Sequence, residues 1–106
     1  MAKIIYNKLV RDKIPEVIQK SGKTCETKVI GGEALKEALV AKLKEEVAEF
    51  EEAHSMEEMA DILEVLEGIC KFHHWNMEEV LKVKSEKRDK RGGFEQGIFL
   101  LETNAE

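Results

Sequence analysis

The hydrophobic positions in the middle of the chain follow helical spacing. Over residues 33–53, apolar side chains recur every three or four positions, which predicts one long amphipathic helix. Ser55 and Asn76 each stand three residues before a glutamate, at the start of a further periodic stretch. This arrangement is typical of N-caps, so two more helices are expected to begin at Met56 and Met77. Because the connections are short, the helices should fold back on each other.

The flanking segments predict less regular structure. A short helix is expected over residues 12–20, with Pro15 in its first turn. Residues 24–30 are rich in β-branched side chains and predict a strand or an extended crossing, whereas the apolar residues 98–101 predict a packed, extended tail. Residues 1–106 contain no repeat or linker. They are expected to form a single all-α domain, in which an antiparallel helical hairpin and a third helix make a core that is completed by oligomerisation.

Composition and charge narrow the class of protein. The chain has 106 residues, with 22 acidic and 17 basic side chains and a formal net charge of −5. No overall positive field is present to neutralise phosphates, which argues against a nucleic-acid polymer as partner. Cys25 and Cys70 are too few to staple a secreted scaffold, and the first residues lack the apolar stretch of a signal peptide or membrane span. We expect a cytoplasmic protein with reduced thiols and no membrane partner.

Four carboxylates lie on or beside the predicted apolar faces. Glu46 falls inside the apolar arc of the first long helix, and Glu49 lies on the flank of that arc. In the next helix, Glu58 falls between two apolar positions and Asp61 borders the apolar face. In an antiparallel hairpin, the pair Glu46/Glu49 would lie opposite the pair Glu58/Asp61 across the helix interface. Because a buried, unpaired carboxylate is costly, several of them together favour a site for a hard cation such as Mg²⁺.

Two of the carboxylates also have an ordinary explanation. Glu58 could be only the third residue of a capping box that begins at Ser55, and acidic residues near a helix start are favoured by the helix dipole. Glu49 could be a solvated residue on the helix flank. Glu46 is the hardest to explain in this way, because it shares a face with leucines. The four residues together therefore favour the metal site.

The third expected helix carries a cationic stripe. Lys84, Lys87, Arg88 and Arg91 continue the face that Met77 and Val80 begin. These cations could pair with the carboxylates, or simply favour the carboxyl end of the helix. Alternatively, they could hold the phosphates of a substrate whose other oxygens are bound to the metal. Spacing alone leaves these alternatives open.

The acidic motifs and their surroundings resemble the MazG-like all-α nucleoside triphosphate pyrophosphohydrolases, a superfamily that includes phosphoribosyl-ATP pyrophosphohydrolase. Its ExxE and ExxD signature is similar to the pairs Glu46/Glu49 and Glu58/Asp61. The phrases YNKLVRDKIPEVI and KRGGFEQGIFL resemble a subgroup of short phosphoribosyl-ATP pyrophosphohydrolase-like proteins. Only eight residues separate Glu49 from Glu58, fewer than is usual in the superfamily, which implies a tight turn between the helices.

The resemblance implies Mg²⁺-dependent hydrolysis of a nucleoside triphosphate between its α and β phosphates, with Mn²⁺ as an alternative cofactor and a homodimer or higher homo-oligomer as the working form. The implied metal ligands and catalytic residues are Glu46, Glu49, Glu58 and Asp61. The expected phosphate contacts are Lys84, Lys87 and Arg91, with Lys8 and Arg11 of the KLVRD phrase. Hydrolysis of phosphoribosyl-ATP in histidine synthesis and a noncatalytic nucleotide-binding or dimerisation module are the alternatives.

Overall fold

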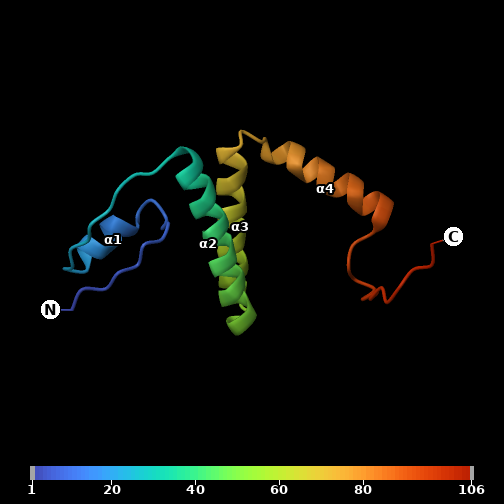
Figure 1. Ribbon diagram of the computed structural model, residues 1–106, viewed down its shortest axis with the longest axis horizontal. Helices are drawn as coiled ribbons and strands as arrows, with labels where there is room; N and C mark the ends of the chain where they lie inside the picture. The colour runs from blue at the N-terminus through green and yellow to red at the C-terminus, as the bar shows by residue number, and fades with distance from the viewer. Residues whose placement is uncertain (1, 106) are drawn as a thin grey trace. The chain divides into compact units, whose positions relative to one another are not determined.

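The computed structural model describes residues 2–105, in which the chain forms four α-helices (Figure 1). They are α1 (Ile14–Lys20), α2 (Gly32–Ala53), α3 (Met56–Phe72) and α4 (Met77–Arg91). No β-strand occurs within residues 2–105, so the expected all-α class is confirmed and residues 24–30 have no regular secondary structure. In the same range, no helix combines the length and hydrophobicity that a membrane span requires.

The chain divides into two compact units, Met1–His74 and Trp75–Glu106. The first unit contains α1, α2 and α3. The second contains α4 and the segment that follows it. The expected packing of a third helix against the hairpin would join the two units, and it stays a prediction, as does the single domain over residues 1–106.

Helix α1 is bounded by residues that suit its two ends. Pro15 lies in the first turn, where its missing N–H removes no helical hydrogen bond. Beyond the last turn, the Gly22 N–H donates to the Gln19 carbonyl oxygen at 3.0 Å. Gly22 has a positive φ of 88°, which glycine adopts without steric cost. The short helix is therefore confirmed, with its first residue two positions later than expected.

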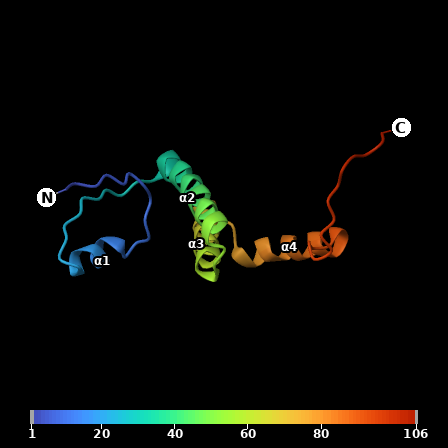
Figure 2. The same cartoon turned by 90° about the horizontal axis from the view of Figure 1, so that it is seen from below.

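Helices α2 and α3 pack side by side as an antiparallel hairpin, and both ribbon views show the pairing (Figures 1 and 2). The turn between them consists of His54 and Ser55. His54 takes the left-handed conformation, with φ 48° and ψ 41°, and its N–H donates to the Phe50 carbonyl oxygen at 2.8 Å. Ser55 caps α3, because its hydroxyl oxygen accepts from the Glu58 N–H at 3.4 Å. The tight turn that the short spacing implies is confirmed.

The contact between Leu39 and Gly68 defines the register of the hairpin. A Cβ atom on Gly68 would lie 3.4 Å from Leu39 Cδ2, so the leucine packs over this glycine. Glu46 follows Leu39 by seven residues, and Asp61 precedes Gly68 by seven. Since the two helices rise equally per residue and run in opposite directions, this register brings Glu46 level with Asp61. The sequence predicts the same register.

The hairpin buries few apolar side chains. Leu39 on α2 and Val65 on α3 are the buried hydrophobic residues of the described chain. Five other apolar side chains of the two helices are 37 to 51% exposed, namely Val40, Val47, Met59, Leu63 and Leu66, and Met56 at the start of α3 is 88% exposed. A core this small covers only part of the apolar arcs that the sequence predicts.

In the second unit, α4 begins at its expected residue. Asn76 caps the helix, because its Oδ1 accepts from the Glu78 N–H at 2.7 Å. The helix ends at Gly92, whose N–H donates to the Arg88 carbonyl oxygen at 2.8 Å. The apolar residues 98–101 are largely exposed, so their expected packing is not found within this unit. A short unit built around one charged helix offers them little apolar surface.

Candidate metal centre

Glu46 is the one buried charged residue of the described chain, with only 5% of its surface exposed. It lies two turns after Leu39 on α2, and therefore on the same face. Its Oε1 lies 3.3 Å from Lys42 Nζ, one turn earlier. Its Oε2 is buried and has no hydrogen-bond partner within the described residues. A buried carboxylate oxygen without a partner is destabilising, so the site suits an additional cation.

Glu49 lies one turn further along α2 and is exposed. The negative charge of Glu46 is the main reason that the pKa of Glu49 is raised above its ordinary value, followed by loss of hydration and by repulsion from Glu45 and Glu58. Glu58 belongs to α3, so carboxylates of both helices are close enough to repel each other. Repulsion of this kind is relieved when a cation binds between the groups.

Glu58 is held by the residue that caps its helix. The Ser55 hydroxyl donates to Glu58 Oε1 at 2.8 Å while accepting from the Glu58 N–H. In a capping box, the glutamate side chain would instead accept from the backbone N–H of the capping residue. The local structure thus supports Ser55 as an N-cap and orients the Glu58 carboxylate. The Ser55 hydroxyl contacts only the Oε1 atom of this carboxylate.

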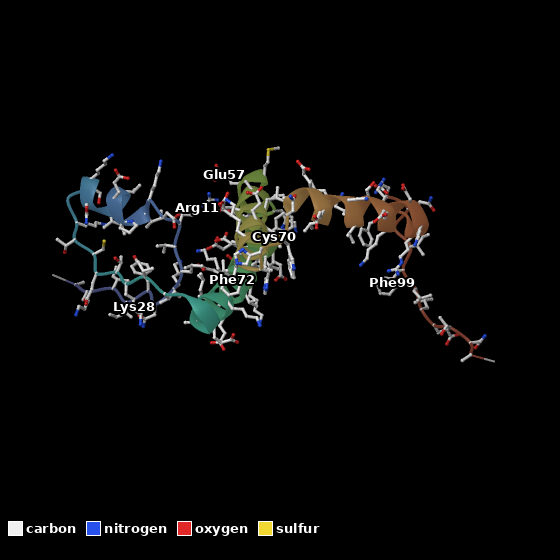
Figure 3. The ribbon with its side chains drawn as sticks, turned by 90° about the horizontal axis from the view of Figure 1, so that it is seen from above. Arg11, Lys28, Glu57, Cys70, Phe72 and Phe99 are labelled. Carbon is white, nitrogen blue, oxygen red and sulfur yellow. The ribbon has the colours of Figure 1, made fainter. Side chains whose placement is uncertain are left out.

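Asp61 is paired with an arginine from the N-terminal segment. Arg11 Nη2 lies 2.7 Å from Asp61 Oδ1, and Arg11 Nη1 lies 3.9 Å from Glu64 Oε1. Figure 3 shows Arg11 beside the α3 ribbon. Asp61 and Glu64 are one turn apart, so a single guanidinium can contact both. The segment before α1 therefore reaches the same hairpin that carries the carboxylates.

Lys8 reaches α2 in a similar way. Its Nζ lies 2.6 Å from Glu45 Oε1, and this hydrogen bond is the main reason that the pKa of Lys8 is raised and that of Glu45 lowered. Glu46 and Glu49 also raise the pKa of Lys8 by charge attraction. Lys8 and Arg11, expected as phosphate contacts, thus lie among the carboxylates.

The four carboxylates are level on the hairpin but are not gathered into a ready-made cluster. Within residues 2–105, no group of three or more His, Cys, Asp or Glu side chains is placed to hold a metal ion. Instead, the pairs Glu46–Lys42, Glu58–Ser55 and Asp61–Arg11 each engage one carboxylate oxygen. The oxygen donors suit Mg²⁺ chemically, and the unpartnered Oε2 of Glu46 is the observation that fits a cation here.

The cationic stripe lies on α4, in the second unit. Lys84, Lys87 and Arg91 recur at helical spacing on one face and are exposed. Arg88, the fourth cation of the predicted stripe, is instead paired within its own unit, with Nη2 2.8 Å from Glu95 Oε1. The expected position of the stripe against the carboxylates stays a prediction.

Two partners of the carboxylates were not predicted from the sequence. Lys42 could have been found, because it lies four residues before Glu46, a spacing at which helical side chains meet. The Arg11–Asp61 pair joins residues 50 positions apart, and no local pattern indicates it.

Comparison of the chain with protein-family models, with curated proteins and with solved structures found no match in any of the three. Inference about function therefore depends on the residues and their geometry, and on the resemblance of the acidic motifs.

Proposed function

We propose that this protein is a Mg²⁺-dependent nucleoside triphosphate pyrophosphohydrolase, which cleaves between the α and β phosphates and releases a nucleoside monophosphate and pyrophosphate. The observation that carries the proposal is Glu46, a buried carboxylate with an unpartnered oxygen, level with Asp61 of the neighbouring helix. An apolar side chain at this position would stabilise the hairpin better, so the carboxylate favours a functional role. The MazG-like motifs point to the same chemistry.

The proposed magnesium ligands are Glu46, Glu49, Glu58 and Asp61. When bound, the ion would neutralise charge on the triphosphate and lower the pKa of the attacking water. Lys8 and Arg11 lie against α2 and α3 through their pairs with Glu45 and Asp61, and so bring positive charge beside the ligands. We assign these two cations, together with the stripe of Lys84, Lys87 and Arg91 on α4, to the phosphates of the substrate.

A noncatalytic helical module is the second candidate, and a specific observation favours it. Three of the four carboxylates already have a partner within the first unit, and the described residues contain no assembled metal-binding group. In such a module, the ion pairs would hold the N-terminal segment on the hairpin. It would release no pyrophosphate from any nucleotide.

Pyrophosphate release from a nucleotide panel tests the proposal and separates the candidates. The panel should contain the common nucleoside triphosphates and phosphoribosyl-ATP, each with and without Mg²⁺. Release from nucleoside triphosphates is expected, whereas release from phosphoribosyl-ATP alone would assign the protein to histidine synthesis. No release from any member would favour the noncatalytic module.

Two isosteric variants connect the activity with the site. Glu46→Gln and Asp61→Asn keep the shape of the side chain but remove its charge, so both should fold and lose pyrophosphate release. Glu51→Gln is the matched control, because Glu51 is exposed on the same α2 helix and is not a proposed ligand. Circular dichroism verifies folding. Full Mg²⁺-dependent turnover in both site variants would rule out the proposed metal centre.

A further inference from the structure

The donors that hold the proposed metal ligands share one geometric feature. Each of them engages a single oxygen of its carboxylate and is not itself a proposed ligand. The three contacts are Lys42 Nζ to Glu46 Oε1 at 3.3 Å, Ser55 Oγ to Glu58 Oε1 at 2.8 Å, and Arg11 Nη2 to Asp61 Oδ1 at 2.7 Å. In Glu46, the remaining oxygen is buried and unpartnered.

Arg11 differs from the other two donors because it comes from outside the hairpin. Lys42 and Ser55 lie on or next to the helix of the carboxylate that they contact, whereas Arg11 lies 50 residues from Asp61. Its pair is partly exposed, with side-chain exposures of 53% for Arg11 and 36% for Asp61. Exposed ion pairs contribute little to stability, so support of the fold is a weak explanation for this contact.

We propose that Arg11, besides the phosphate contact assigned to it above, is a positioning residue for the metal centre, which fixes Asp61 through Oδ1 and leaves Oδ2 to a divalent cation. The inference rests on the proposed function. A carboxylate that is already oriented loses less conformational freedom when it binds the metal. Arg11 would also make the centre depend on the N-terminal segment, which carries Lys8 as well.

Removing Arg11 changes the divalent cation affinity in opposite directions for a positioning role and for a purely electrostatic one. If the guanidinium acted only as a nearby positive charge, or competed with the metal for Asp61, its loss would strengthen divalent cation binding. If it orients Asp61, its loss weakens that binding. The sign of the change in metal affinity therefore distinguishes positioning from repulsion or competition.

Mn²⁺ binding to the full chain, followed by electron paramagnetic resonance without nucleotide, measures this sign. The dissociation constant of Arg11→Ala should rise on the order of tenfold, the scale found when partners of metal ligands are removed. Arg11→Lys keeps a cationic donor and should bind Mn²⁺ more tightly than Arg11→Ala. Lys13→Ala removes one positive charge from the same segment and should match the wild-type protein.

A further variant tests the route through Asp61. Glu64→Gln weakens the other contact of Arg11, at 3.9 Å, and should leave Mn²⁺ affinity unchanged. Melting temperatures of all variants should be similar, since the pair is exposed. Affinity in Arg11→Ala that equals or exceeds the wild-type value would overturn the inference, as would no recovery in Arg11→Lys or an equal loss in Glu64→Gln. Absence of Mn²⁺ binding to the wild-type protein would instead contradict the proposed function.

Discussion

Glu46 occupies a position where the hairpin would gain stability from an apolar side chain. It lies on the same face of α2 as Leu39 and is buried, but Lys42 is its only ion-pair partner among the described residues. Lys42 also lies 3.1 Å from Glu45 Oε2, so it would keep a partner if Glu46 were replaced. The unfavourable contribution of Glu46 to folding stability is therefore the desolvation of its own carboxylate.

Glu46→Leu should stabilise the protein while removing activity. Replacing the buried carboxylate by an apolar side chain removes the desolvation cost, and we expect the free energy of unfolding to rise by about 1 kcal/mol or more. Urea denaturation without divalent cations measures the change. Glu51→Leu at an exposed site of α2 is the control and should change stability by less than about 0.5 kcal/mol. Lower stability of Glu46→Leu would mean that Glu46 supports the fold.

Glu95 offers a pH-dependent test within the second unit. Its pKa is lowered mainly by a hydrogen bond from its own backbone N–H and further by Arg88. The folded pKa is below the unfolded one, so the contribution to stability is present above the ordinary value of 4.5 and is lost as pH falls through the lowered pKa.

Arg88→Met should raise the pKa of Glu95 only part of the way to its ordinary value, because the backbone hydrogen bond remains. Carboxyl chemical shifts recorded by NMR against pH measure this pKa. Gly93→Ala is a second way to disturb the Arg88–Glu95 ion pair, since a Cβ atom there would displace the flexible ends of both side chains. A pKa that stays at the wild-type value in Arg88→Met would show that the ion pair is not formed in solution.

At the scale of elements, α4 changes its chemistry along one face. Met77 and Val80 are half-buried near its start, whereas the same stripe continues as the exposed Lys84, Lys87 and Arg91. A helix that only completed a core would keep apolar residues along this stripe. The change to cations favours contact with an anionic ligand.

Lys87→Ala and Arg91→Ala should each lower kcat/KM about tenfold to a hundredfold, the scale of one lost charge-assisted hydrogen bond. The loss should be equal for every nucleotide, because phosphates are common to all of them. Lys82→Ala, on another face of α4, is the control. If the stripe has only a structural role, melting temperature should fall while kcat/KM of the folded protein stays normal. Unchanged kcat/KM in both stripe variants would refute the phosphate assignment.

At the scale of the whole molecule, the described chain leaves much apolar surface uncovered. Leu39 and Val65 alone are buried among its hydrophobic residues. On α3, Met56, Met59, Leu63 and Leu66 are exposed and recur at alternating spacings of three and four residues. This spacing is typical of a helix face that packs against another helix.

We predict a homodimer or higher homo-oligomer in which helical faces of two subunits share a core. Light scattering coupled to gel filtration should give at least twice the chain mass of 12.1 kDa at micromolar concentration. Leu63→Lys should shift the protein toward the monomer and lower its melting temperature, whereas Glu57→Lys, also exposed on α3, should do neither. A strictly monomeric wild-type protein would contradict this prediction.

The sequence by itself determined the four helices and most of their ends, although α1 begins two residues later than expected. Periodicity and capping depend on residues within a few positions of each other, so the starts of α3 at Met56 and α4 at Met77 could be predicted. The same local reasoning placed Glu46 on an apolar face, and the structure buries it. The two-residue turn then fixed an antiparallel pair in which Glu46 and Asp61 are level.

Only the tertiary structure decided which groups meet across the chain. Arg11 with Asp61 and Lys8 with Glu45 join residues 50 and 37 positions apart, and many other cations could have filled these places. The unpartnered Oε2 of Glu46 likewise follows from how two helices exclude water from one oxygen. Contacts between distant residues depend on the path of the whole chain and on packing, whereas helices follow from local backbone bonding and side-chain spacing.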